Sequence, residues 1–189
     1  DPTNPNTIYM GTPAGGLWKT INGGVSWNPM TDNLPQIGVS GIAINPSNPN
    51  EIYISTGDKD AGDTYSVGVF KSLDGGLTWN TTGLTFTTSS NRSGDIVIHP
   101  TNSSILFCAT SAGLYKTSDS GTTWSVVQSG NFSQGNVRFK PNDPTVIYAT
   151  TNNRFYKSTN TGDTFVIITA GLSAVGSTTR MLLDVTPAD

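Results

Sequence analysis

Short apolar segments recur along the chain, and the spacing between them is regular. Each of four prolines is followed, six and seven residues later, by an apolar residue and an aromatic or apolar partner. These pairs are Ile8-Tyr9, Ile52-Tyr53, Leu106-Phe107 and Ile147-Tyr148. Short runs of β-branched and aromatic residues bounded by Gly, Pro, Asn and Asp predict strands joined by tight turns. Adjacent apolar residues break the alternation of a half-exposed strand, which indicates strands buried on both faces.

A second motif keeps step with the first. It reads Ser or Thr, any residue, Asp or Asn, any residue, Gly, any residue, Ser or Thr, and then Trp or Phe. The copies lie about 40 to 50 residues apart, which is the period of propeller blades. The defining residues of the four copies are Asn22, Gly24, Trp27; Asp74, Gly76, Trp79; Asp119, Gly121, Trp124; and Asn160, Gly162, Phe165.

Together the two motifs predict four strands in each repeat. In the second repeat these are Ile42–Ile44, Ile52–Ser55, Val69–Ser72 and a strand that begins at Trp79. Sheets stacked around an axis bury both faces of their strands. We therefore expect an all-β fold, a β-propeller with four blades of four antiparallel strands. The blades are expected near residues 1–34, 35–88, 89–130 and 131–172.

The segment 173–189 has a different role in this scheme. Met181–Pro187 aligns with the first strand of a repeat and its proline, whereas the chain begins at Asp1-Pro2, where such a strand has already ended. The segment is thus expected to form the first strand of the next blade or of the first blade. A closed four-bladed ring is one alternative. We favour the other, a segment of a larger propeller of roughly 270–350 residues.

The second motif resembles the Asp box, also called the BNR repeat. That motif occurs in sialidases, xyloglucanases, sortilin-type receptors and a photosystem assembly factor, and the resemblance implies a β-propeller of six or more blades. The segments Asp1–Asn6 and Gly15–Thr20 are also similar to secreted surface proteins of gliding bacteria, many of which carry a C-terminal sorting domain.

The chemistry of this motif is structural. The Asp or Asn side chain is expected to accept backbone N–H groups two or three positions further on, and the Gly to adopt a positive φ. The closing aromatic residue is expected to pack between strands. Four catalytic carboxylates are disfavoured, because Asn replaces Asp in two copies and an acid–base role would not survive that change.

Composition and charge exclude several partners. Only 12% of residues are charged and the net charge is −3, without a basic run that would bind nucleic acid. No apolar run reaches the ~20 residues of a transmembrane helix. The single Cys108 falls on a core strand position, and His99 falls on a turn before a proline. Low charge and the resemblance favour an extracellular or bacterial cell-surface protein.

One connection carries the candidate chemistry. The link from Thr56 to Lys71 is longer than its counterparts and holds the acidic residues Asp58, Asp60 and Asp63. They are candidate Ca²⁺ ligands or a carboxylate pair for glycoside hydrolysis, although a solvated loop that caps its own turns is favoured. Tyr65 and Arg92 are expected on the same face, where aromatic and planar polar groups suit carbohydrate.

These observations favour a binding or scaffold module for a polysaccharide or a protein partner rather than an enzyme. Apart from the candidate Ca²⁺ site, no cofactor is expected. The remaining blades of the parent chain are further expected partners. One alternative is part of a xyloglucanase-like glycoside hydrolase whose catalytic residues lie partly outside this chain. Another is a structural spacer of an adhesin. Sialidase activity is disfavoured, since Arg92, Arg138, Arg154 and Arg180 fall at unequal positions in their repeats.

Overall fold

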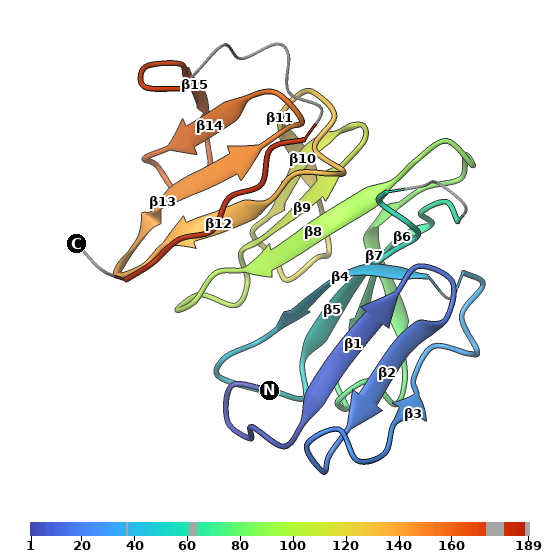
Figure 1. Cartoon of the computed structure of the whole chain (residues 1–189). Coiled ribbons are helices and arrows are strands. Elements are labelled where there is room, and N and C mark those ends of the chain that lie inside the picture. The colour runs from blue at the N-terminus through green and yellow to red at the C-terminus, as the bar shows by residue number, and fades with distance from the viewer. Residues whose placement is uncertain (37, 61–63, 173–179, 188–189) are drawn as a thin grey trace.

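The chain folds into four small β-sheets placed side by side around a common centre (Figure 1). The computed structural model describes residues 1–36, 38–60, 64–172 and 180–187. Within these residues there is no helix. The described part of the chain accordingly holds no helix with the length and apolar character that a membrane span requires. The prediction of an all-β fold is confirmed, and the arrangement is that of a partial β-propeller.

Each sheet is a blade built from consecutive, antiparallel strands. Blade 1 contains β1 (Ile8–Thr12), β2 (Gly16–Thr20) and β3 (Asn28–Pro29). Blade 2 contains β4 (Val39–Ile44), β5 (Ile52–Thr56), β6 (Gly68–Ser72) and β7 (Asn80–Thr85). Blade 3 contains β8 (Ser93–Ile98), β9 (Leu106–Thr110), β10 (Gly113–Thr117) and β11 (Ser125–Gln128). Blade 4 contains β12 (Val137–Lys140), β13 (Asp143–Thr150), β14 (Phe155–Ser158) and β15 (Val166–Ile168).

The inner strands of blades 2, 3 and 4 approach one another closely. Strand β4 contacts β8, and β8 contacts β12. A Cβ added at Gly41 would lie 2.5 Å from the carbonyl oxygen of Gly94, and one added at Gly94 would overlap the carbonyl of Ser133. The same Gly94 carbonyl accepts a 2.6 Å hydrogen bond from Ser55 Oγ. Glycine is required here because neighbouring backbones meet without space for a side chain.

The hydrophobic core lies between the blades rather than within one of them. The fully buried side chains include Ile52 and Tyr53 of β5, Leu106 and Phe107 of β9, and Ile147 of β13. Neighbouring residues of one strand point to opposite faces of the sheet, and here both neighbours are buried. This confirms the prediction that the strands are covered on both faces. Cys108 is also fully buried, and this burial raises the pKa of its thiol, so Cys108 packs as a small apolar residue.

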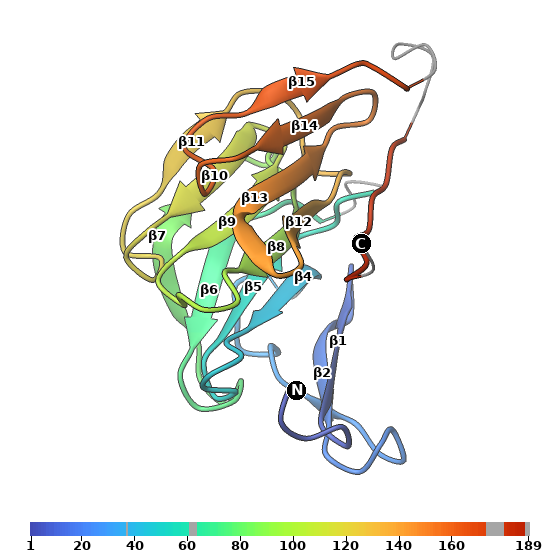
Figure 2. The ribbon, with the colours of Figure 1, turned by 90° about the vertical axis from the view of Figure 1, so that its left-hand side faces the viewer.

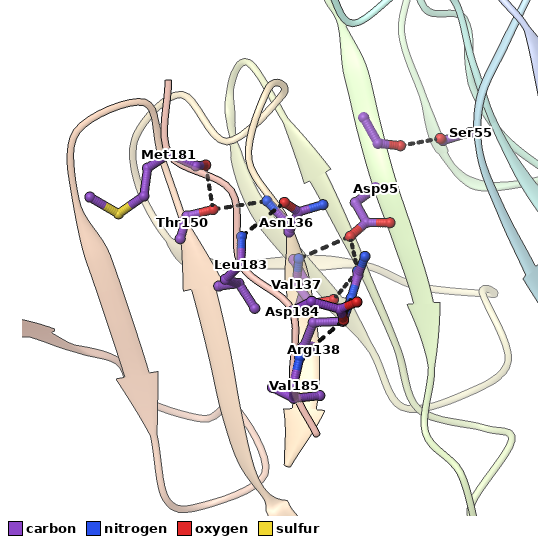
Figure 3. A network of polar contacts seen from close by, with 11 residues as sticks. Ser55, Asp95, Asn136, Val137, Arg138, Thr150, Met181, Leu183, Asp184 and Val185 are labelled. Carbon is purple, nitrogen blue, oxygen red and sulfur yellow. Dashed lines mark hydrogen bonds and ion pairs between the residues drawn. The ribbon is translucent and has the colours of Figure 1, made fainter. Parts of the chain in front are cut away.

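The C-terminal segment runs beside the inner strand of blade 4 (Figure 3). Thr150 Oγ1 donates to the carbonyl of Met181 over 3.2 Å, and Leu183 N donates to Asn136 Oδ1 over 3.3 Å. Residues 180–187 form no strand. The expected first strand of a blade is therefore not formed in them, because their described hydrogen bonds go to side chains instead of a backbone ladder. Residues 173–179 and 188–189 of that prediction lie outside the described residues.

Candidate ligand-binding face

The four copies of the second motif form the turn between the third and fourth strand positions of each blade. We call these turns the repeat hairpins, residues 20–27, 72–79, 117–124 and 158–165. In the second of them, Asp74 Oδ1 accepts Thr78 N at 2.9 Å and Asp74 Oδ2 accepts Thr78 Oγ1 at 2.6 Å. Ser72 Oγ donates to Asp74 Oδ1 over 2.8 Å. The backbone N–H of Leu77, three positions on, also donates to Asp74, as the sequence suggested, and the contacts with Thr78 extend the turn by one further residue.

The carboxylates of these hairpins are strongly acidic. Hydrogen bonds from the side chain and backbone of Thr78 lower the pKa of Asp74 to about 2, and those from Thr123 lower the pKa of Asp119 to about 2. Asn22 and Asn160 make the same turn with an amide, because Asn22 Oδ1 accepts Ser26 N at 3.0 Å and Asn160 Oδ1 accepts Thr164 N at 3.0 Å. The hairpins are therefore structural elements, and they lie at the opposite ends of their strands from the β5–β6 loop.

The β5–β6 loop contacts all four blades. Thr64 Oγ1 donates to the carbonyl of Pro13 in blade 1 over 2.8 Å. Ser66 N donates to the carbonyl of Asn91, at the entrance to blade 3, over 2.8 Å. Gln134 Nε2, just before blade 4, donates to the carbonyl of Asp60 over 3.3 Å. The described parts of this loop therefore lie among connections of blades 1, 3 and 4, and Figure 2 shows these blades turned by 90° from the view of Figure 1.

The acidic side chains of this loop are engaged with protein groups. Asp58 is buried, and its Oδ1 accepts the backbone N–H of Asp60 over 2.8 Å. Asp60 pairs with Arg180 over 3.1 Å between Oδ1 and Nη1. Asp63 lies outside the described residues. Within the described residues, no three His, Cys, Asp or Glu side chains are grouped as they would be around a metal ion.

Tyr65 belongs to this loop, and Arg92 lies next to it in the chain connection that enters blade 3. Tyr65 is 43% exposed. The backbone of Arg92 is fixed by Ser111, because Arg92 N donates to Ser111 Oγ over 3.0 Å. The structure therefore brings Asp58, Asp60 and Tyr65 into one loop and sets Arg92 beside that loop.

Sequence reasoning missed a polar pocket on this face. A pocket of about 530 Å³ lies where the β11–β12 and β13–β14 connections meet, and its walls are mostly polar. The walls are formed by Ser129, Gly130, Asn131, Thr151, Asn152, Asn153, Arg154 and Tyr156. Asn152 Nδ2 donates to Gln134 Oε1 over 3.0 Å, so the pocket is linked through Gln134 to the β5–β6 loop. The cluster of Asn residues and Arg154 after β13 was the available signal.

Two further ionised side chains of the blades, Arg138 and Glu51, form ion pairs within the fold. Arg138 forms ion pairs with Asp95 and with Asp184, so it joins β8, β12 and the C-terminal segment (Figure 3). Burial by itself would raise the pKa of Glu51, but hydrogen bonds from Lys71, Asn45 and Tyr53 together lower it. Every described carboxyl group with a resolved shift has a lowered pKa.

Comparison with known proteins connects this fold to polysaccharide-active proteins. No protein-family model matches the chain. The chain is 32% identical over 135 residues to a xyloglucanase of a Paenibacillus species, with 65% of this chain and 13% of the relative covered. It is 31% identical over 140 residues to the xyloglucanase Xgh74A of Acetivibrio thermocellus, with 67% and 17% covered. The chain thus has xyloglucanase homologues and spans less than a fifth of their length.

Solved structures with the same fold agree with these relatives. An ancestral GH74 enzyme superposes with a TM-score of 0.75 at 24% identity over 90% of this chain and 23% of that chain. The GH74 enzyme of Niastella koreensis gives a TM-score of 0.68 at 28% identity over 87% and 28%. YCF48 bound to the D1 peptide gives 0.62 at 17% identity over 91% and 54%, which shows a shared fold alone.

Proposed function

We propose that this chain is a segment of a larger extracellular propeller that degrades xyloglucan or a related β-glucan. The supporting observation is the identity of 31–32% to two xyloglucanases over 135–140 residues, in a fold shared with GH74 enzymes. The extracellular location is part of this proposal, because an enzyme that degrades a large polysaccharide meets its substrate outside the cell. Placement at a bacterial cell surface is a further proposal, and it rests on the resemblance to surface proteins.

The segment's part in this function is to hold the polymer. A glycosidase needs one carboxyl group whose pKa is raised, so that it donates a proton to the leaving oxygen. Among the described carboxyl groups, every one with a resolved shift has a lowered pKa instead. Asp60 is held in an ion pair with Arg180. We therefore assign the catalytic pair, at least in part, to residues outside the described ones.

The pocket beside blade 4 has the character of a sugar-binding site. Asn131 and Arg154 are exposed at its edge and Asn153 is half-buried in its wall. Side-chain amides and a guanidinium donate and accept in fixed planes, which matches the hydroxyl groups around a sugar ring. Its volume of about 530 Å³ lies within the ~300–1,000 Å³ of typical ligand sites.

The test is binding of the 189-residue chain to xyloglucan, measured by affinity gel electrophoresis and by calorimetry with xyloglucan oligosaccharides. Arg154→Ala is expected to weaken binding by at least about tenfold, because a hydrogen bond to a charged group contributes about 1.5–3 kcal/mol and about 1.4 kcal/mol is a factor of ten. Lys140→Ala is the matched control, since Lys140 is also an exposed cation of blade 4 but lies at the far end of β12. If the 189-residue chain migrates equally fast in gels with and without xyloglucan, the proposal is contradicted.

A second candidate is a scaffold that binds a polysaccharide or protein without degrading it. The engagement of Asp58 and Asp60 with loop groups favours this alternative, because neither carboxylate is poised as an acid or base. A reducing-sugar assay on the longer parent protein separates the two. Sugar release that Asp58→Ala or Asp60→Ala abolishes would exclude the scaffold, whereas binding without release would exclude the hydrolase. An adhesin spacer is expected to show neither.

A further inference from the structure

The three joints between the four blades share one set of contacts. In every blade an aromatic residue of the second strand position pairs across the sheet with a Lys of the third. These pairs are Tyr9 with Lys19, Tyr53 with Lys71, Phe107 with Lys116 and Tyr148 with Lys157. In the first three pairs the Lys Nζ lies 5.1–5.8 Å from the ring centroid, which is a cation–π distance.

Each of these three pairs receives the repeat hairpin of the following blade. The acceptor is the carbonyl of the residue that precedes the motif's glycine. Lys19 Nζ donates to the carbonyl of Gly75 over 2.9 Å, and Tyr9 Oη donates to the same carbonyl over 3.1 Å. At the next joint Tyr53 Oη donates to the carbonyl of Ser120 over 3.1 Å.

The third joint repeats the pattern with the lysine alone. Lys116 Nζ donates to the carbonyl of Thr161 over 2.8 Å, because Phe107 has no hydroxyl group. At each joint the Lys, the aromatic hydroxyl group or both therefore donate to one backbone carbonyl, and we call the Lys–aromatic pair a socket. At the second joint only Tyr53 donates, because Lys71 Nζ pairs with Glu51 over 2.7 Å.

The glycine of each docked hairpin packs against the ring of the socket. A Cβ built on Gly76 would lie 3.8 Å from Tyr9 Cε1, and one built on Gly121 would lie 3.5 Å from Tyr53 Cε1. A Cβ on Gly162 would overlap the ring of Phe107. The motif's glycine thus does more than adopt a positive φ. Because it has no side chain, the aromatic ring of the preceding blade can lie on the hairpin backbone.

Blade 4 carries the same socket without a hairpin in it. Tyr148 and Lys157 are partly exposed, and no hydrogen bond or ion pair of their side chains is found among the described residues. Phe155 stacks on Tyr148 with 5.7 Å between ring centroids. The residues at the position of Phe155 in the other blades, Leu17, Val69 and Leu114, are at most 1% exposed. The equivalent faces of blades 1, 2 and 3 are therefore covered, whereas this face of blade 4 is partly exposed.

We propose that the Tyr148–Lys157 face of blade 4 docks the repeat hairpin of a further blade. Lys157 Nζ and Tyr148 Oη donate to the carbonyl that precedes the hairpin glycine, and the Tyr148 ring covers that glycine. The occupant is identified by continuity, because three equivalent faces in this chain each hold such a hairpin. Further blades are also consistent with the similar GH74 structures, because this chain spans only 23–28% of their length.

The first repeat hairpin is the counterpart of this open socket. Gly23 is exposed, whereas Gly75 at the same position in blade 2 is buried under Tyr9 and Lys19. A second copy of the chain offers this free hairpin, so self-association is the competing occupant that the experiment must distinguish.

The experiment extends the chain by one blade. Residues 101–128, which follow Pro100 and form the last three strands of blade 3, are appended after Pro187. This keeps the spacing between the proline and the repeat hairpin. We expect the thermal midpoint to rise by about 5 °C or more over that of the 189-residue chain, since each blade interface adds its own stabilising interaction. Light scattering is recorded on both chains.

The socket variants decide the outcome. Lys157→Met and Tyr148→Ala are expected to remove most of the rise in the extended chain, whereas Lys140→Met in the same blade leaves it unchanged. An equal rise in Lys157→Met would overturn the proposal, and so would appended residues that give no dispersed amide resonances. Concentration-dependent dimers of the 189-residue chain that Lys157→Met disrupts would assign the socket to a second copy and would likewise overturn it.

Discussion

Replacement of Tyr53 by Phe tests how much the buried hydroxyl group of Tyr53, which lies where blades 2 and 3 meet, stabilises the fold. The hydroxyl group of Tyr53 lies 2.8 Å from Glu51 Oε1 and 3.1 Å from the carbonyl of Ser120, and the side chain is fully buried. The hydroxyl has one proton for these two acceptors, so the substitution removes about one hydrogen bond to a charged group. Such a bond contributes about 1.5–3 kcal/mol. We expect a loss of about 2 kcal/mol, or about 4–8 °C in Tm for a chain of this size.

The assay is denaturant unfolding of the 189-residue chain, with Tyr9→Phe as the matched control. Tyr9 Oη also donates to a hairpin carbonyl, that of Gly75, but it is partly exposed and Lys19 keeps the same carbonyl hydrogen-bonded. The control is therefore expected to lose only about 0.5–1 kcal/mol. If Tyr53→Phe loses no more than Tyr9→Phe, the buried hydroxyl group adds nothing beyond a partly exposed hydrogen bond and the reasoning is refuted.

Three further predictions rest on single residues, and a fourth concerns the acidic residues of the β5–β6 loop. Because burial and the hydrogen bond to Glu51 raise the pKa of Tyr53 to about 12, its stability contribution is complete below about 10 and is lost as the pH rises from 10 to 12. Tyr53→Phe should flatten alkaline unfolding in this window, and an unchanged slope would contradict the assignment. Asp74→Asn should reduce acid destabilisation between pH 4 and 2, because the lowered pKa of Asp74 makes its contribution present above about 4 and lost toward 2. This variant should keep its fold, since Asn22 and Asn160 already occupy that position in two other hairpins. An acid transition equal to that of the wild type would contradict this prediction. Gly94→Ala should destabilise by about 1–3 kcal/mol or prevent folding, because its Cβ would overlap the Ser133 carbonyl, whereas wild-type stability would show that the inner strands are looser. Calcium is predicted to raise Tm if Asp58, Asp60 and Asp63 bind it, and a Tm unaffected by chelator would discard that site.

The sequence predicted the strands and their order because it repeats. Four copies of two linked motifs specify where each strand starts and which residues face inward, and these are local properties. The repeat hairpins could be located to the residue for the same reason. The additional bonds from Thr78 to Asp74 were not predicted, because the turn geometry that carries Thr78 back to the carboxylate depends on the conformation of both glycines between them.

The tertiary structure alone decided which residues meet between blades. The engagement of Asp60 by Arg180 and the pocket around Arg154 join segments from different blades, and no local pattern records such pairs. The same is true of the sockets. Tyr9, Tyr53, Phe107 and Tyr148 hold one position in the repeat, yet only packing shows that the first three hold a hairpin and that Tyr148 does not. Periodicity determines the blade, whereas contacts between blades depend on distances that periodicity does not encode.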